Sequence, residues 1–339
     1  MAHATDLVAT LGSADSLAIV GHDDPDPDCL ASALALEAIA ETLGVEEVVI
    51  TYGGRISHQQ NRAFVDALAV DARRLETVAV SEYDRVAFVD HSTPGRTRGL
   101  SATVTPDVVI DHHPGSSIDA TVRDVRSDYG ATVTIMVEYL QTLEVTLTER
   151  LATALLFALH RERLDFVRHP TRREYEAALW VYDRADLSLL AELYGSAFAP
   201  ATVDAIGRAI CSRHRRGSAI VASAGRTPVP DAMPQAADYL LNVEGVRTTL
   251  VYGLVDGTVR LSARTSDGDV NIGAVLEAAF GAWGAVGGHH DMGGGTIDLG
   301  VFDSTADDEA VLAVLEDHLP TQFFASLGVR AGDPQLNEA

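Results

Sequence analysis

The stretch SLAIVGHDDPDPD, residues 16–28, joins a short apolar run to a loop of imidazole and carboxylate groups. The apolar part predicts a buried strand, and the two prolines stiffen the loop that follows it. The stretch DVVIDHHP, residues 107–114, repeats this arrangement, with an Asp-His-His triplet directly behind an apolar run. Open α/β sheets bind ligands at the carboxyl ends of their parallel strands. We therefore expect both loops to meet at one sheet edge, where they could assemble a pair of divalent metal ions.

Short β-rich runs alternate with helical patterns through the first half of the chain. Strands are predicted at residues 16–20, 47–52, 85–89 and 107–110. Helices are predicted at residues 31–43, 59–68, 131–143 and 150–160. Alternation of this kind predicts an α/β fold with a mainly parallel, doubly wound sheet that is covered on both faces.

The second half of the chain predicts a smaller α/β domain with a mixed sheet. Asp256 and Gly257 lie between two β-rich runs and indicate a tight hairpin. A helix at residues 271–280, a glycine-rich loop and a strand at residues 296–301 are expected to follow. Pro200 and an arginine-rich piece indicate a connector before this domain. The predicted boundaries are a first domain at residues 1–195, a linker at 196–216 and a second domain at 217–329.

The chain of 339 residues has a formal net charge of −24, from 49 acidic and 25 basic residues, and every one of these cations is arginine. Such an acid excess repels itself in dilute buffer, whereas molar salt screens it. A salt-rich cytoplasm explains this composition, and an ordinary acidic protein is the alternative. Binding to long nucleic acid weakens steeply with salt. A nucleotide partner should therefore be small and held in a pocket.

The sequence shows no pattern typical of a membrane span, a signal peptide or a set of disulfides. No apolar run reaches the roughly 18 residues that a membrane span needs, and the first thirty residues lack a signal-peptide pattern. We expect a cytoplasmic protein. The two cysteines, Cys29 and Cys211, offer no disulfide framework, so any metal is expected to be held by His, Asp and Glu.

Each candidate motif also has a structural interpretation. The Asp-rich loop by itself can be a capped turn, and Asp90, at the end of a predicted strand, can be a helix cap or turn residue. The Asp-His-His triplet is more specific, because two adjacent histidines at a strand end are costly to bury unless each ring nitrogen has a partner. Together the three segments favour a metal site.

In this order the motifs resemble the DHH phosphoesterase superfamily, specifically its branch with a DHHA1-type C-terminal domain. The resemblance spans nearly the whole chain and rests on HDDPDPD at residues 22–28, Asp90, DHHP at 111–114 and GGHHDMGGG at 287–295. The last stretch is similar to the family's glycine-glycine-histidine signature. The resemblance implies a catalytic metal-binding first domain and a substrate-binding second domain.

The resemblance also implies roles for individual residues and two manganese ions per active site. The first ion would be bound by His22, Asp26 and Asp90. The second would be bound by Asp28, Asp90 and His112, with Asp90 as the bridge. The catalytic residues would be Asp111 and His113, with His113 facing the phosphate. The terminal phosphate of the substrate would be bound in the second domain by Arg264, Gly287, Gly288 and His289.

One position departs from the family's pattern. The family usually has an aspartate after the helix at residues 152–160, and here Glu162 takes its place. Glutamate carries the same charge one methylene further out and could still coordinate the second metal. Alternatively, Glu162 pairs with Arg161 or Arg163 and leaves that metal loosely held. Asp165 is a weaker candidate for the same role.

The resemblance implies a manganese-dependent phosphoesterase that uses a metal-activated water. Its substrates would be very short oligonucleotides, nucleotides like 3'-phosphoadenosine 5'-phosphate, or linear or cyclic dinucleotides. A cleft between the domains would select these substrates by their length. The alternatives are a single-strand-specific exonuclease, for which the chain length and acidity leave little room, and a non-catalytic nucleotide sensor. A family II pyrophosphatase would match the first domain only. No membrane or long-duplex partner is expected, and the oligomeric state, a homodimer included, stays open.

Overall fold

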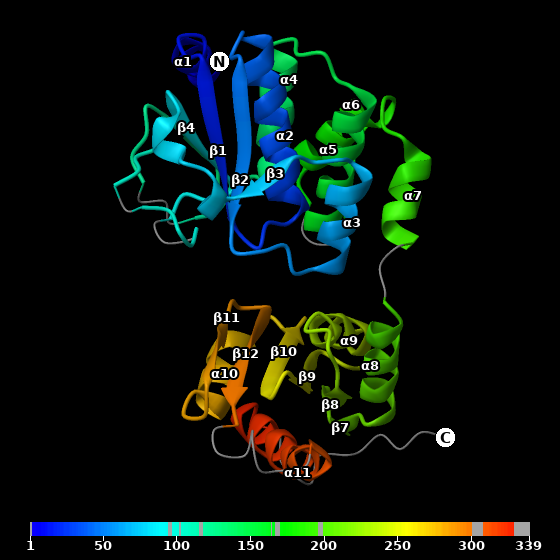
Figure 1. The fold of residues 1–339 in the computed structure, drawn as a ribbon. Coiled ribbons are helices and arrows are strands. Elements are labelled where there is room, and N and C mark those ends of the chain that lie inside the picture. The colour runs from blue at the N-terminus through cyan, green and yellow to red at the C-terminus, as the bar shows by residue number, and fades with distance from the viewer. Residues whose placement is uncertain are drawn as a thin grey trace. The chain divides into compact units, whose positions relative to one another are not determined.

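The computed structural model describes residues 2–93, 97–101, 103–114, 118–163, 165–166, 170–195, 199–299 and 308–328. The chain divides into two compact units, Met1–Ala197 and Phe198–Ala339, whose elements are labelled in Figure 1. Among the described helices, none combines the length and the apolar character that crossing a bilayer requires.

The first unit is built on an all-parallel sheet of six strands in the order β3-β2-β1-β4-β5-β6. The strands are β1 (Ser16–Asp23), β2 (Glu47–Gly53), β3 (Ala72–Arg74), β4 (Arg85–Val89), β5 (Val108–Asp111) and β6 (Val122–Val125). The predicted α/β class and mainly parallel sheet are confirmed. The sequence did not predict β3 and β6, because these short edge strands contain arginine or aspartate among their few residues and show no apolar run.

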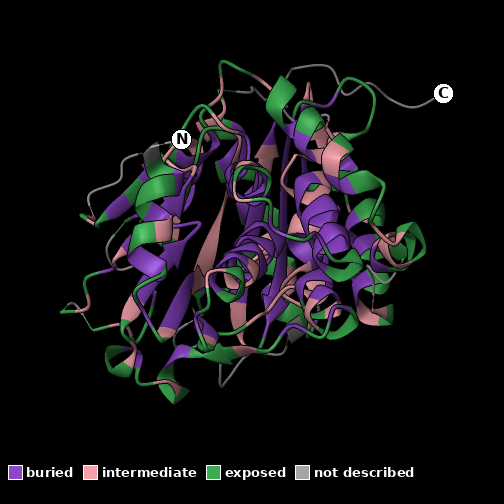
Figure 2. Cartoon of the chain, turned by 90° about the horizontal axis from the view of Figure 1, so that it is seen from above, coloured by how far each residue is buried: buried purple, intermediate pink, exposed green. Residues whose placement is uncertain are grey.

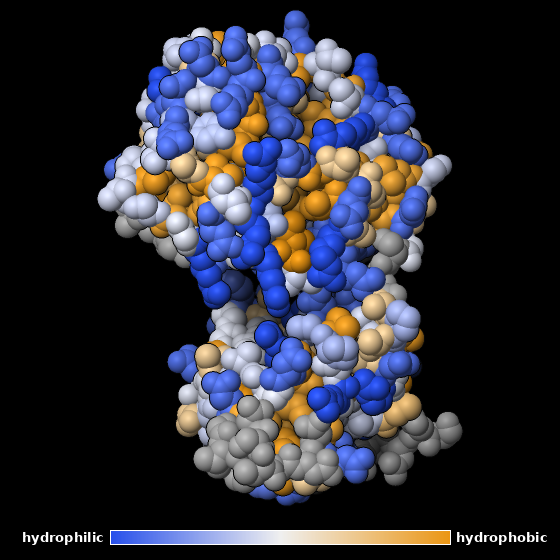
Figure 3. All heavy atoms as spheres, viewed as in Figure 1, coloured by the Kyte–Doolittle hydropathy of each residue, from blue (hydrophilic) through white to orange (hydrophobic). Residues whose placement is uncertain are grey.

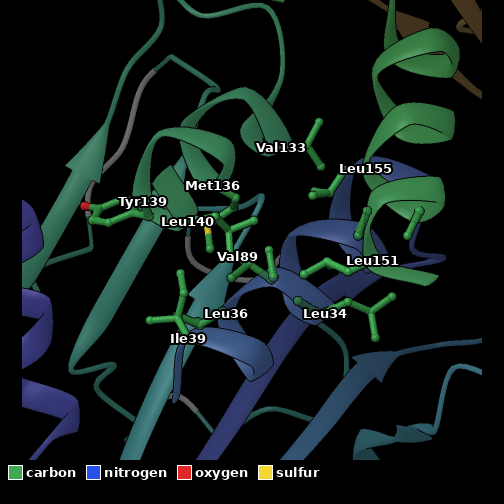
Figure 4. Close-up of a cluster of buried hydrophobic side chains, with 14 of the residues drawn as sticks. Leu34, Leu36, Ile39, Val89, Val133, Met136, Tyr139, Leu140, Leu151 and Leu155 are labelled. Carbon is green, nitrogen blue, oxygen red and sulfur yellow. The ribbon is translucent and has the colours of Figure 1, made fainter. Parts of the chain in front are cut away.

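Helices of the first unit pack mainly on one face of this sheet. They are α1 (Ala2–Leu11), α2 (Pro27–Thr42), α3 (Gln59–Ala67), α4 (Thr132–Thr142), α5 (Glu149–Glu162), α6 (Arg172–Tyr182) and α7 (Leu187–Gly195). Figure 4 shows the core that α2, α4 and α5 form with Val89 of β4. The buried residues on the opposite face belong to the strands and to the 3-10 helices η1 (Leu75–Thr77) and η2 (Val80–Glu82), with loop residues packed around them.

Central strand β1 is buried on both faces. Leu17 and Ile19 face the helical core, Ala18 and Val20 face the other side, and none of the four has exposed surface. Figure 2 shows buried residues along the strands and exposed residues on the outer sides of the helices and in the loops. Full burial of a large aliphatic side chain stabilises the fold by about 1.5–3 kcal/mol, so this run anchors the sheet. The order of the strands places the topological switch point between β1 and β4, where ligands bind in such sheets.

The second unit has a mixed sheet of six strands in the order β11-β12-β10-β9-β8-β7. The strands are β7 (His214–Arg216), β8 (Ala219–Arg226), β9 (Thr248–Val255), β10 (Thr258–Thr265), β11 (Ala285–Gly288) and β12 (Met292–Asp298). The helices are α8 (Pro200–Cys211), α9 (Ala232–Leu241), α10 (Ile272–Phe280) and α11 (Asp308–Ser326). Only β8 and β9 pair in parallel, which confirms the mixed sheet that the sequence predicts.

Two segments differ from their predicted local structure. The predicted linker at 196–216 contains α8 and β7, because Ala205, Ile206 and Ala209 form a buried apolar face behind the arginines. Residues 196–198 lie outside the described ranges. The predicted glycine-rich loop is wrong: residues 285–288 and 292–298 pair as antiparallel strands. Glycine has a low β-propensity and no side chain that could show the alternation of polar and apolar residues typical of a strand. The sequence therefore does not predict this hairpin.

Candidate metal centre

The loop between β1 and α2 is both a helix cap and part of a polar cluster. Asp26 is the N-cap of α2, and its Oδ1 accepts a hydrogen bond of 3.1 Å from the backbone N–H of Cys29. Pro27 occupies the first helical position, where its missing N–H costs nothing. The capped turn left open by the sequence is therefore present, and it leads the buried Asp28 into the first turn of the helix.

Asp90, directly after β4, lies at the centre of the cluster. His22 Nε2 is 3.3 Å from Asp90 Oδ2, and His112 Nε2 is 3.7 Å from Asp90 Oδ1. Asp90 is 1% exposed and has a left-handed backbone with φ of 61°. A non-glycine residue in this conformation carries backbone strain of the kind found at functional sites. The five predicted ligands of the β-strand loops thus include a buried carboxylate shared by two histidines.

The orientation of both histidines is set by backbone carbonyls. His22 Nδ1 lies 2.9 Å from the carbonyl oxygen of Asp23, and His112 Nδ1 lies 3.3 Å from that of Tyr129. If Nδ1 carries the proton in each ring, Nε2 is unprotonated and can bind a cation together with the neighbouring carboxylates. His112 Nε2 also lies 3.7 Å from Asp28 Oδ2. This is the arrangement that a metal-ligating imidazole requires.

Asp111 supports His113. Its Oδ1 accepts hydrogen bonds from the backbone N–H of His113 (3.0 Å) and pairs with the ring Nδ1 at 2.8 Å, while its other oxygen accepts from Ser92 Oγ. Burial alone would raise the pKa of Asp111, but the hydrogen bonds from His113 and Ser92 lower it to about 2. The His113 side chain is 37% exposed. The Asp111 carboxylate is therefore charged at neutral pH and holds the orientation of the partly exposed His113 ring.

The carboxylates of this cluster repel one another. Burial raises the pKa of Asp28 well above its ordinary value, and the charges of Asp90 and Glu162 raise it further. The pKa of Asp26 is raised by burial and by the charge of Asp90. A bound cation would offset this repulsion, because buried charges need a partner. Carboxylate oxygens and imidazole nitrogens suit divalent metals, manganese included, so the donor set fits the predicted ion.

Six predicted ligands contribute to this region in different ways. The distances above link His22, Asp28, Asp90 and His112. Asp26 and Glu162, the last residue of α5, are close enough for their charges to raise the pKa of Asp28. Cys29 was not predicted as a ligand. Its sulfur, His22 and Asp90 form one possible metal-holding group of the described residues, and Asp90, His112 and His113 form another. The expectation that only His, Asp and Glu line the site is therefore incomplete.

In the second unit, the structure brings Arg264 next to the turn of the β11–β12 hairpin. Arg264 pairs with Met292 across β10 and β12, and the backbone N–H of Thr265 donates to the carbonyl of Asp291 (2.8 Å). The Arg264 guanidinium is held by Asp238 at 2.8 Å. His289 is exposed at the start of the turn. Both predicted cationic donors therefore lie at one end of this sheet.

The two glycines predicted to bind substrate, Gly287 and Gly288, have different surroundings. A Cβ atom at Gly288 would lie 2.4 Å from Gly293 Cα and from the Met292 carbonyl oxygen, whereas a Cβ at Gly287 would meet no atom within 4 Å. Gly288 also lies against Gly273 at the start of α10. Packing therefore requires Gly288, and the open space at Gly287 leaves room for a ligand.

Comparisons with known proteins agree with this organisation. An uncharacterized protein of Methanocaldococcus jannaschii is 32% identical over 315 residues, which cover 93% of this chain and 64% of that protein. A probable manganese-dependent inorganic pyrophosphatase of Enterococcus faecalis is 27% identical over 181 residues, covering 52% of this chain and 57% of the relative. The chain thus spans less than two thirds of the length of these relatives.

A solved structure and two family models cover both units. The fold is similar to that of an exopolyphosphatase-related protein from Bacteroides fragilis, with a TM-score of 0.76, 14% identity and coverage of 96% of this chain and 98% of the other. Residues 16–159 match the DHH family, N-terminal domain, and residues 217–317 match the DHHA1 domain. The chain therefore belongs to the DHH superfamily, with a DHH family N-terminal domain followed by a DHHA1 domain.

Proposed function

We propose that this protein is a manganese-dependent phosphoesterase that hydrolyses short oligonucleotides, nucleotides like 3'-phosphoadenosine 5'-phosphate, or linear or cyclic dinucleotides. The observation that carries the proposal is the buried carboxylate and imidazole cluster around Asp90 at the switch point of the parallel sheet. Relatives described as manganese-dependent support the choice of metal. Two ions per site are proposed, with Asp90 between them.

The residues of the cluster divide into metal-holding and substrate-facing groups. The proposed metal ligands are His22, Asp26, Asp28, Asp90, His112 and Glu162. Manganese bound there would neutralise phosphate charge and lower the pKa of water toward neutrality, so that hydroxide is available as the nucleophile. His113, held by Asp111, would donate a hydrogen bond to a phosphate oxygen as negative charge develops on it.

The DHHA1 domain would bind a terminal phosphate of the substrate. Arg264 and His289 lie at one end of its sheet and offer cationic donors to a terminal phosphate. Gly287 leaves space for a close approach of that phosphate to the backbone. The net charge of −24 and the hydrophilic side chains seen over much of the visible surface in Figure 3 favour a small cytoplasmic substrate over long nucleic acid.

A second candidate is a nucleotide sensor without turnover. Glu162 favours the sensor, because it replaces the family's aspartate at a proposed ligand position. Its charge is close enough to Asp28 to raise the pKa of that carboxyl group. A longer side chain places the carboxylate differently and could weaken one metal site. The sensor and the enzyme both bind nucleotides, so only turnover distinguishes them.

The test is hydrolysis of a substrate panel by the full chain in molar KCl with Mn²⁺. The panel contains RNA and DNA dinucleotides, a cyclic dinucleotide, 3'-phosphoadenosine 5'-phosphate, long single-stranded DNA and pyrophosphate. We expect release of mononucleotides or phosphate from the short substrates, loss of this activity with EDTA, and recovery when Mn²⁺ is restored. A preference for long single strands would favour the exonuclease, and tight binding without any hydrolysis would favour the sensor.

A further inference from the structure

Thr132, the first residue of α4, contacts two carboxylates of the metal centre at once. Its Oγ1 donates a hydrogen bond of 2.7 Å to Asp90 Oδ1, and its backbone N–H donates one of 2.8 Å to Asp28 Oδ2. The backbone N–H of Val133 donates a further bond of 2.8 Å to Asp28 Oδ1. Thr132 is completely buried. Asp90 precedes Thr132 by 42 positions and Asp28 precedes it by 104, so these contacts join α4 to distant parts of the chain.

Hydrogen bonds from other segments hold the turn that precedes Thr132. The carbonyl of Tyr129 lies 3.3 Å from His112 Nδ1, and the backbone N–H of Gly130 donates a bond of 2.9 Å to the buried Glu174. A Cβ at Gly130 would lie 2.5 Å from the Glu174 carboxyl carbon, so Gly130 permits this close approach. Residues 129–133 therefore form a supported turn whose backbone and hydroxyl groups face three proposed ligands.

We propose that Thr132 is a positioning residue that fixes the orientation of the Asp90 and Asp28 carboxylates for the metal ions. This inference rests on the proposed metal centre. Thr132 holds Oδ1 of Asp90 on the side of His112, which leaves Oδ2 facing His22. The two N–H groups at the start of α4 hold both oxygens of Asp28, where the helix dipole favours negative charge. The nitrogens of His112 and His113 approach Asp90 Oδ1 only to 3.7 and 3.8 Å.

The physical basis is the cost of leaving a buried carboxylate free to rotate. Without the hydroxyl, Asp90 Oδ1 loses the hydrogen-bond donor that fixes its orientation. Ligand side chains then have to be ordered by the metal itself, which weakens binding. Loss of such an outer hydrogen bond typically reduces metal affinity by about 10- to 100-fold.

The same helix offers a matched control. Thr134 is buried two residues further along α4, and its Oγ1 has no hydrogen-bond partner within the described parts of the chain. Thr132→Val and Thr134→Val therefore remove the same hydroxyl from the same helix, and only the first removes a contact with Asp90. Thr132→Ser restores a hydroxyl without the methyl group.

The experiment measures Mn²⁺ affinity of the metal-free full chain from the electron paramagnetic resonance signal of free Mn²⁺, together with the melting temperature without metal. We expect Thr132→Val to raise the dissociation constant by about 10- to 100-fold, and Thr132→Ser and Thr134→Val to stay within about threefold of the wild type. The metal-free melting temperature shows how much of the fold each variant keeps, and Thr132→Val should melt lower than Thr134→Val because it leaves a buried carboxylate without its donor. If Thr132→Val does not fold, Thr132→Ala makes the same comparison with the backbone donor intact.

The inference is overturned if Thr132→Val binds Mn²⁺ as tightly as the wild type, or if Thr134→Val weakens binding equally. It is also overturned, together with the proposed metal centre, if the wild type binds no Mn²⁺. Because affinity and not turnover is measured, the positioning role can fail while the proposed hydrolysis stands, and hydrolysis can fail while the positioning role stands.

Discussion

His22 Nε2 lies 3.3 Å from Asp90 Oδ2, although 68 positions separate the two residues in the chain. They are close because β1 and β4 are adjacent parallel strands, so the loops that follow them leave the sheet at the same edge. Burial by itself raises the pKa of Asp90, but the hydrogen bond and charge of His22 lower it below its ordinary value. Without a metal, the pair therefore keeps the buried carboxylate ionised, and a metal bound by His22 Nε2 would take the place of the proton on that nitrogen.

Replacing Asp90 by Asn tests this centre directly. The amide keeps the size of the side chain but removes the charge shared by His22 and His112, so Mn²⁺ affinity should fall by about 100-fold or more, with hydrolysis falling at least as much. Isothermal titration with Mn²⁺ measures the first effect. Asp66→Asn, on the exposed side of α3, is the control and should change neither value. Unchanged Mn²⁺ affinity in Asp90→Asn would remove Asp90 from the site.

Substitutions of Glu162 distinguish a ligand from an ion-pair residue. If Glu162 coordinates metal, Glu162→Asp should keep or increase hydrolysis, and Glu162→Gln should lower Mn²⁺ affinity by about 10-fold. If it only pairs with a neighbouring arginine, both variants should behave like the wild type. Activity and Mn²⁺ titration are measured on the same preparations. Absence of turnover in the wild type and both variants would favour the nucleotide sensor.

The β11–β12 hairpin should tolerate a methyl group at Gly287 but not at Gly288. A Cβ at Gly288 would overlap the backbone of β12, so Gly288→Ala should lower the free energy of unfolding by about 1–3 kcal/mol. Gly287→Ala should change it by less than about 0.5 kcal/mol. Urea unfolding measures both. If Gly287 accepts the substrate phosphate, its alanine variant should instead raise KM. Equal destabilisation by both changes would contradict this view of the hairpin.

Asp124 should stabilise the first unit in a pH-dependent way. The buried Asp124 carboxylate accepts two hydrogen bonds from Arg126 (2.7 and 2.6 Å) and one from Tyr139 (2.8 Å). Burial alone would raise the pKa of Asp124, but these bonds lower it. The stabilisation is therefore present above the unfolded-state pKa of about 3.9 and is lost as pH falls through the lower folded-state value.

We expect Asp124→Asn to lower the free energy of unfolding by about 1.5–3 kcal/mol at pH 7, because it breaks the charge-assisted bonds to Arg126, which keeps Glu138 as its other partner. The difference from the wild type should be constant between neutral pH and about pH 5 and should narrow below about pH 4. Urea unfolding across this range measures it. Asp128→Asn breaks an exposed pair with Arg173 and should cost less than about 1 kcal/mol. A pH-independent difference would contradict the assignment to Asp124.

Salt should stabilise the folded chain through charge screening. With a net charge of −24, raising KCl from dilute buffer to molar concentration should increase the melting temperature by about 5 °C or more. Sucrose at equal osmolality is the control, because it favours compact states without screening charges. Equal stabilisation by sucrose and KCl would mean that self-repulsion is not what limits stability.

Local patterns in the sequence are enough to predict the parallel sheet and the order of the polar clusters. Apolar runs such as residues 16–20 and 107–110 become central strands because burial on both faces needs a continuous apolar segment. The polar residues that follow these runs meet because parallel neighbours end at one edge. His22, Asp28, Asp90 and His112 could therefore be named as neighbours before any coordinates were known.

Contacts between distant segments carry the information that local patterns lack. Thr132 reaches Asp28 across 104 positions, Ser92 supports Asp111, and Cys29 lies beside His22 and Asp90, and the residue types around these three positions do not predict the contacts. The glycines of the β11–β12 hairpin show no alternation, so their pairing follows only from packing against β10 and α10. A strand or a loop of ligands can be predicted from neighbouring residues. The hydrogen bonds that orient those ligands cannot, because they depend on which segments fold against one another.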